Sequence, residues 1–163
     1  MSRDLVRPGF EPFIALAEKA ARALRNDMLL SAHRAGHTQI APAHNAVFAT
    51  LPPEGARAAD MAARSGITRQ SMGEVVRDMV RLGLLEMAPD PSDRRAKIVR
   101  FTEHGKVVAQ AGFDHILALE DALREELGEA DLETTRRVLR RVREMLAGDV
   151  DDGPVPAALR HQG

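Results

Sequence analysis

The sequence contains no cysteine, no tryptophan and no tyrosine, so its five phenylalanines are its only large aromatic residues. Without cysteine the chain can form no disulfide, no thiolate metal site and no thiol-based redox switch. A surface that stacks single-stranded nucleic acid needs several exposed rings, so we do not expect that function either. The chemistry of this chain must come from charged, amide, hydroxyl and imidazole groups.

Long apolar runs are also missing. No segment approaches the roughly 18 apolar residues of a membrane-spanning helix, and the opening MSRDLVRPGF lacks the apolar core of a signal peptide. Three enzyme signatures are absent: a glycine-rich phosphate loop, Gly-x-Ser-x-Gly and His-Glu-x-x-His. We therefore expect a cytoplasmic protein with no enzymatic activity, no cofactor and no membrane partner.

Charge is distributed unevenly along the 163 residues, although the formal net charge is only −1. Residues 57–101 contain nine Arg and Lys against six Asp and Glu, whereas residues 102–163 contain eight against thirteen. A locally basic segment attracts phosphate even when the whole molecule is nearly neutral. The middle of the chain is therefore the candidate for a nucleic-acid contact.

Hydrophobic periodicity predicts a mainly α fold with one small β-hairpin. Apolar residues recur at spacings of three and four over residues 10–33, and shorter helices are expected at 42–51, 57–64 and 69–82. Two strands, 84–88 and 97–101, flank a polar turn with two prolines. Two long helices follow, with Thr102 and Asp131 as expected N-caps.

This order of elements suggests four parts. We predict an N-terminal dimerisation helix (1–37), a winged helix-turn-helix domain (38–103), C-terminal dimerisation helices (104–147) and a flexible tail (148–163). The first and last helices carry wider apolar stripes than a small bundle would bury. A bundle within one chain is the alternative, but we favour a homodimer.

The stretch from Arg57 to Gly83 has the pattern of a helix-turn-helix, with Gly66 in the turn. Arg and Gln side chains can bond to guanine and adenine edges, and a glycine allows close approach to the duplex. Met72 either contacts a thymine methyl or packs inward. A helical bundle with a solvated polar face remains the alternative. The expected DNA contacts of the second helix are Thr68, Arg69, Gln70, Ser71, Gly73 and Arg77.

A hairpin directly after that helix makes the motif a winged helix-turn-helix. Its tip, Ser92-Asp93-Arg94-Arg95, is expected to project, and a projecting arginine suits the strongly negative minor groove. Asp93 stands close enough to Arg95 to pair with it and fix its direction, while Arg94 and Lys97 would hold the phosphate backbone. We predict double-stranded DNA as the partner. The alternative is a winged-helix module that binds another protein and never touches DNA.

From about Pro42 to Gly105 the sequence resembles the MarR family of bacterial transcriptional regulators. The DPSDRR tip followed by Thr-x-x-Gly carries the resemblance most specifically. It implies an obligate homodimer, a recognition helix at 68–82, a wing pair of Asp93 with Arg95, and repression relieved by a small ligand. The stretch IAPAHNAVF departs from the family pattern, because Ala41, His44 and Asn45 replace the usual threonine cap, glutamine and aromatic residue.

Two kinds of sensing site are conceivable from these residues. The resemblance suggests a pocket for a small aromatic or anionic effector, lined by Met28, His44 and Phe48, between the dimerisation helices and the winged domain. A zinc-responsive regulator would use His33, His37 and His44. Gly36 interrupts a shared helical face, so surface histidines without metal are the favoured interpretation.

Overall fold

The structure, a computed structural model, describes residues 9–147, apart from the side chains of Arg94 and Ala147; the predicted tail at 148–163 lies outside the described residues. Helices dominate, and the two strands form one antiparallel hairpin, so the predicted fold class is confirmed. The elements are α1 (Phe13–Arg34), η1 (Pro42–His44), α2 (Asn45–Phe48), α3 (Ala58–Ser65), α4 (Arg69–Arg81), β1 (Leu85–Asp90), β2 (Asp93–Phe101), α5 (Glu103–Leu127) and α6 (Glu129–Ala147).

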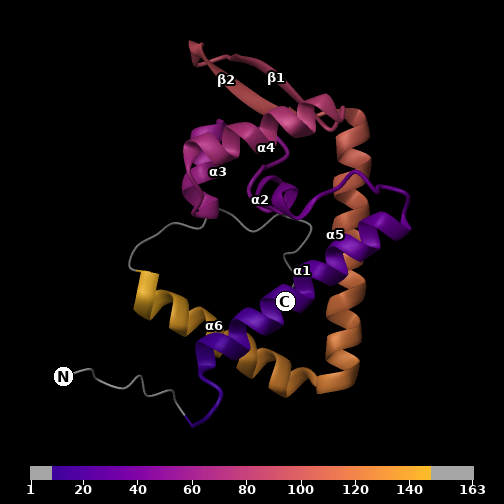
Figure 1. Ribbon diagram of the computed structural model, residues 1–163, viewed down its shortest axis with the longest axis vertical. Coiled ribbons are helices and arrows are strands. Elements are labelled where there is room, and N and C mark those ends of the chain that lie inside the picture. The colour runs from indigo at the N-terminus through magenta and orange to yellow at the C-terminus, as the bar shows by residue number, and fades with distance from the viewer. Residues whose placement is uncertain (1–8, 148–163) are drawn as a thin grey trace, which may run out of the picture.

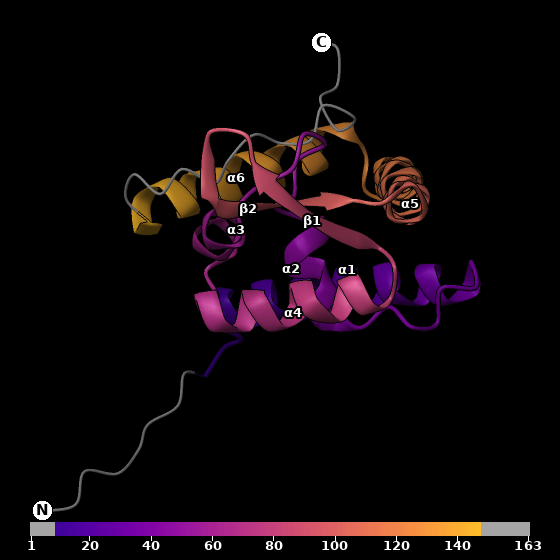
Figure 2. The same ribbon diagram turned by 90° about the horizontal axis from the view of Figure 1, so that it is seen from above.

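Figure 1 shows α4 and the hairpin together at one end of the molecule and α6 at the opposite end. The long helix α5 runs between the two ends, and α1 crosses it. Seen from above in Figure 2, the hairpin extends over α2 and α3, and α4 lies along one side of them. The motif predicted to bind DNA thus lies at the opposite end from α6, and α5 joins the two ends. Among residues 9–147, no helix is both long and apolar enough to cross a membrane.

The core of the winged domain is built mainly from the apolar faces of α3, α4 and β1. α3 and α4 meet through an interhelical turn in which Gly66 adopts φ 68° and ends α3. Ile67, in the same turn, packs against the core. Met72, which had two predicted roles, is fully buried and therefore packs inward. The largest fully buried side chains include Met61, Met72, Met79, Leu84, Leu85 and Val99.

Threonine side chains cap the starts of α4 and α5, and of the two predicted N-caps Thr102 is confirmed. The Thr68 hydroxyl oxygen accepts the Ser71 N–H at 3.0 Å, and the Thr102 hydroxyl oxygen accepts the Gly105 N–H at 2.9 Å. Asp131 was predicted to cap the last helix, which is wrong because α6 already begins at Glu129. The Leu132 N–H bonds to the Gly128 carbonyl, so Asp131 lies inside the first turn.

The hairpin is longer than the sequence predicted. β1 includes Pro89, which lies opposite Lys97, and β2 begins at Asp93, so the turn itself is only Pro91 and Ser92. A proline lacks the N–H that a central strand needs, but β1 has a partner on one side only. Lys97 is therefore paired within the hairpin, whereas Arg95 lies in β2 in the irregular stretch 94–96, between the pairs Pro89–Lys97 and Asp90–Asp93.

The other side of β2 carries one further bridge, between Ala56 and Val99. Gly55 precedes it with φ 95°, a conformation that favours glycine. A Cβ atom at Gly55 would stand 2.8 Å from the Val99 carbonyl oxygen, so the chain can approach β2 this closely only without a side chain. The segment before α3 is thereby fixed to the hairpin.

Helices α1, α5 and α6 leave many large apolar side chains in water. α1 is joined to α5 by a 2.6 Å contact between His115 Nε2 and Asp27 Oδ2. One side of α6 presents a row of exposed apolar residues. The exposed large apolar residues of α1 and α6 are Phe13, Ile14, Leu16, Leu24, Leu30, Val138, Leu139, Met145 and Leu146.

Candidate nucleic-acid interface and adjoining pocket

The outer face of α4 presents the polar side chains that the sequence predicted. Arg69, Gln70 and Arg77 are exposed. The amide nitrogen of Gln70 donates to Glu74 Oε1 at 3.2 Å, one turn further along the helix. This contact lies on the surface, where a base edge can replace it at small cost. Sequence reasoning did not assign Glu74 a role, although the i, i+4 spacing to Gln70 indicates the pair.

Thr68 and Ser71 have a more structural position than predicted. Their hydroxyl oxygens lie 2.8 Å apart, and the Thr68 oxygen also accepts the Ser71 N–H. Both side chains are exposed, but their hydroxyls already hold the first turn of α4. Their described contacts orient Arg69 and Gln70 by fixing the start of the helix.

Gly73 leaves less open space than expected. A Cβ atom built there would lie 3.3 Å from Nη1 of Arg77. The Arg77 side chain therefore folds back along the helix over Gly73. This guanidinium is the end of a flexible side chain, so it can swing outward toward a phosphate or a base.

The wing, residues 85–101, is fixed to the start of α3 by an ion pair that sequence reasoning missed. Arg57 Nε donates to Asp90 Oδ2 at 2.7 Å, and Nη2 of the same guanidinium lies 2.5 Å from that oxygen. The other carboxylate oxygen of the buried Asp90 accepts the N–H and the hydroxyl of Ser92, at 2.8 and 2.7 Å. The hydrogen bonds from Ser92, followed by that from Arg57, lower the pKa of Asp90 to about 2.

The Asp90 contacts set the shape of the wing tip. The hydrogen bond to Asp90, with the attraction of its charge, raises the pKa of Arg57, so both partners stay ionised over the physiological range. A buried carboxylate with donors on both oxygens has one preferred orientation. The two-residue turn is therefore held from inside the domain. The spacing Asp90-Pro-Ser92 is a sequence signal for such a turn.

Asp93 does not make the contact that the sequence predicted. Its Oδ1 accepts the main-chain N–H of Arg95 at 3.0 Å, and its Oδ2 lies 3.9 Å from Nη2 of Arg57. The predicted pairing with the Arg95 guanidinium is replaced by a contact to the Arg95 backbone. Asp93 thus fixes the start of β2, while Arg95 and Lys97 point from exposed positions of the strand.

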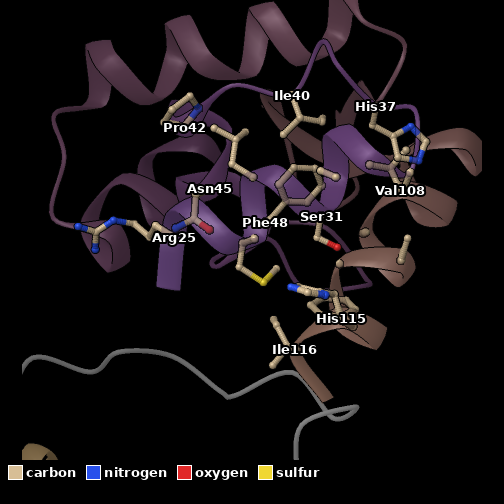
Figure 3. A pocket seen from close by; sticks show the side chains of 18 of the residues that line it. Arg25, Ser31, His37, Ile40, Pro42, Asn45, Phe48, Val108, His115 and Ile116 are labelled. Atoms are coloured by element: carbon tan, nitrogen blue, oxygen red, sulfur yellow. The ribbon is translucent and has the colours of Figure 1, made fainter. Parts of the chain in front are cut away.

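A cavity of about 550 Å³ lies between α1, the η1–α2 segment and α5 (Figure 3). Figure 3 shows Phe48 and Ile40 at the cavity, with Arg25 and His37 on opposite sides of it. Met28 and Phe48 line it, as predicted, but His44 does not. Its wall is largely apolar, and its polar groups include Arg22, Arg25, Asn45, His37 and His115.

The comparisons with known proteins agree with this geometry. Residues 46–96 match the model of the MarR family. The uncharacterized protein Rv2011c of Mycobacterium tuberculosis is 31% identical over 142 residues, which cover 87% of this chain and 94% of that protein.

The chain belongs to the MarR family.

Several solved structures share the fold at lower sequence identity. The MarR family transcription regulator SP03579 has a TM-score of 0.71 at 19% identity and covers 82% of this chain and 87% of its own. The transcriptional repressor CouR, solved on a 23-mer DNA duplex, has a TM-score of 0.66 at 24% identity and covers 81% and 92%. The structure of MarR has a TM-score of 0.65 at 22% identity and covers 90% and 95%.

Within this MarR-family fold, His44 has a role that the sequence did not suggest. Its ring is buried, Nδ1 accepts the Ala41 N–H at 3.1 Å, and Nε2 lies 2.8 Å from Asp78 Oδ2. The ring therefore holds the start of η1 from its last residue, because Nδ1 accepts the N–H of the N-cap residue Ala41. The hydrogen bond from His44 is also the main cause that lowers the pKa of Asp78.

The three histidines proposed for zinc do not converge. His33 Nε2 lies 2.8 Å from the Ile40 carbonyl oxygen, and His44 uses both ring nitrogens within the chain. The His37 ring faces His104 instead, with centroids 6.2 Å apart. In the part of the chain that the structure describes, no three histidine or carboxylate side chains gather closely enough to hold a metal ion.

Proposed function

We propose that this protein is a DNA-binding transcriptional regulator that acts as a homodimer on a near-palindromic operator. It is most simply a repressor whose DNA affinity falls when a small effector binds. The observation that carries the proposal is the exposed Arg69–Gln70 end of α4 beside a basic wing whose tip is fixed by Asp90 and Arg57. Such a pair of elements fits two neighbouring grooves of a duplex.

Each basic or amide side chain has a role in this proposal. Arg69, Gln70 and Arg77 lie on the outer face of α4, where they would contact bases or phosphates of the major groove. Arg95 would enter the minor groove, and Lys97 would hold the backbone beside it. Asp93 acts through the main chain of Arg95. The CouR structure, solved on a DNA duplex, supports this use of the shared fold.

The homodimer rests on the apolar surface of α1 and α6. Ile14 is 67% exposed and Leu146 is 75% exposed, so a single copy leaves large hydrophobic groups in water. Burying such groups is worth about 25 cal/mol per Å² of apolar surface. A two-fold dimer through these helices would place two α4 helices about 34 Å apart, one turn of DNA, and so require a near-palindromic site.

The effector site is the cavity between α1, η1–α2 and α5. Its largely apolar wall suits an aromatic ring, and Arg22 and Arg25 suit an anionic group such as a carboxylate. The cavity adjoins both the helices of the proposed dimer and the segment that packs on α4. A ligand there is well placed to change how the winged domain is held.

Selection of bound duplexes from a random pool tests the function directly. We expect recovered duplexes to share an inverted repeat and binding to weaken steeply as salt rises, because phosphate contacts release counterions. Arg95→Ala should weaken binding to all sequences by about 1–3 kcal/mol, whereas Gln70→Ala should relax preference at one base position. A protein that enriches no sequence and binds duplex without salt dependence would instead be a protein-interaction module.

A further inference from the structure

A buried histidine connects the wall of the cavity to the helix that faces DNA. The His44 ring is 2% exposed, and its two nitrogens contact two different elements. Nδ1 holds the Ala41 N–H, and Nε2 reaches Asp78 of α4, which is 34 residues away in the chain. Because Nδ1 accepts an N–H, the proton of the neutral ring must sit on Nε2, which therefore donates to Asp78.

The His44 contact on the cavity side is made with the wall itself. Ala41, Pro42 and Asn45 line the cavity, and they surround His44 in the sequence. His44 lies outside the cavity, so a ligand reaches it only by moving these neighbours. Any displacement of Ala41 acts directly on Nδ1 through a hydrogen bond of 3.1 Å.

On the side of α4, the Asp78 carboxylate is shared. Its Oδ2 accepts the hydrogen bond from His44 Nε2, and its Oδ1 accepts an N–H of Arg81 Nη2 at 2.7 Å. Asp78 follows Arg77, which lies on the outer face, and stands nine residues after Arg69. At 1.5 Å per residue this is roughly 13 Å, so a tilt of about 5° around Asp78 moves the Arg69 end by about 1 Å. That displacement is enough to break a bidentate hydrogen bond to a base.

We propose that His44 is a positioning residue that transmits occupation of the cavity to α4 through Asp78. The inference rests on the proposed function, since it assigns the route between the effector site and the DNA-binding helix. Buried apolar contacts of Val76 and Met79 keep α4 attached to the domain but are not directional. The hydrogen bond from His44 is directional, and it selects one tilt of the helix.

The test must fill the cavity with a group of known structure, because the effector itself is not identified. The chain has no cysteine, so Ser31→Cys introduces a single thiol on α1 at the cavity. Benzyl methanethiosulfonate converts that thiol to a benzyl disulfide and releases methanesulfinate. DNA affinity is then measured with a duplex selected from the random pool, for labelled and unlabelled protein of each variant. This comparison within one variant cancels any change in basal affinity.

Two substitutions at His44 separate its two hydrogen bonds. His44→Asn ends near the position of Nδ1, so it can keep the contact with Ala41 but cannot reach Asp78. His44→Gln extends to about the position of Nε2, so its amide can still donate to Asp78. Thermal unfolding of both variants shows whether the fold is retained.

We expect the label to weaken DNA binding of Ser31→Cys about tenfold, within the usual range of coupling between two sites. The same label should change binding less than about twofold in Ser31→Cys with His44→Asn, and about tenfold again with His44→Gln. An equal loss in the His44→Asn background would overturn the proposal and assign the route to α5. A label that leaves Ser31→Cys unaffected would also overturn it, although DNA binding by the unlabelled protein would leave the proposed regulator standing. An unmodified chain that binds no duplex would refute both.

Discussion

At the scale of single residues, the wing depends on a carboxylate that never needs to touch DNA. Asp90 gathers donors from Ser92 and Arg57 and thereby joins the tip of the hairpin to the start of α3. The exposed Arg95 is useful only if this tip keeps one shape. Asp90 is therefore a residue whose loss should change both stability and DNA binding without removing a DNA contact.

Asp90→Asn should lower stability at neutral pH, because one hydrogen-bond donor of the amide would face Arg57 or Ser92. The pKa of Asp90 is lowered from 3.8 to about 2, so the ionised group stabilises the fold fully above about pH 5. That contribution is lost as the pH falls through about 2. Thermal unfolding of both proteins between pH 7 and pH 2 should show a gap in Tm that is constant above about pH 5 and narrows in acid. A gap that is independent of pH would exclude this role.

Some residues of the candidate site could be predicted from the sequence, whereas the Arg57–Asp90 and His44–Asp78 contacts could not. Arg69, Gln70, Arg95 and Lys97 follow from the local pattern of an outward face and a strand, and they are exposed as predicted. The contacts of Arg57 with Asp90 and of His44 with Asp78 join residues 33 and 34 positions apart. Such partners depend on how helices pack, which no local pattern encodes. For the same reason His44 was wrongly placed in the cavity.

At the scale of elements, boundaries were predicted best where a side chain or a glycine defines them. Thr68 and Thr102 cap α4 and α5, and Gly128 ends α5 with φ 81°. The hairpin was predicted too short because its prolines were read as turn residues, whereas Pro89 lies in an edge strand. The bridge from Ala56 to β2 was not predicted, because a single bridged residue leaves no periodic pattern.

Gly55→Ala should destabilise the protein through this bridge. The new Cβ would meet the Val99 carbonyl oxygen at 2.8 Å and the side chains of Ile98 and Arg100 at 2.7 Å. Gly36 is a matched control, because its φ of 92° resembles the 95° of Gly55 but nothing lies within 4 Å of its Cβ.

Chemical denaturation of both variants separates the two effects. Gly36→Ala should lower the free energy of unfolding only by the roughly 1–2 kcal/mol that a positive φ costs a residue with a Cβ atom. Gly55→Ala should lose at least about 2 kcal/mol more, because backbone atoms cannot move aside without breaking the bridge. Equal losses in the free energy of unfolding would mean that the clash is relieved by a small shift and that the bridge has little weight.

At the scale of the whole molecule, α4 and the hairpin lie at one end and α6 lies at the opposite end (Figure 1). The winged domain buries its own core, whereas α1 and α6 leave apolar residues exposed that a single copy cannot cover. The sequence predicted this surplus from the width of the apolar stripes. The sequence could not predict which faces of α1 and α6 stay exposed, because α5 covers part of each helix.

Leu139→Glu tests whether a second copy covers this surface. Leu139 is 48% exposed on α6, so the carboxylate costs a single chain little but would be buried without a partner in a dimer, at a cost of several kcal/mol. We expect sedimentation to show a dimer for the native chain and a monomer, or a fold with a concentration-dependent Tm, for the variant. Val107→Glu is the control, because Val107 is 64% exposed near the start of α5, at the end of the molecule opposite α6 (Figure 1).

The loss of the dimer should reach the DNA because two half-sites are bound together. A monomer holds one half-site, so the footprint of Leu139→Glu should shrink to one arm of the inverted repeat. Its affinity for the whole operator should fall at least about tenfold, since the second half-site no longer benefits from a tethered partner. The Val107→Glu control should sediment as the native protein does. If Leu139→Glu remained a dimer with a full footprint, the copies would have to meet through another surface, and the exposed row on α6 would need a different partner.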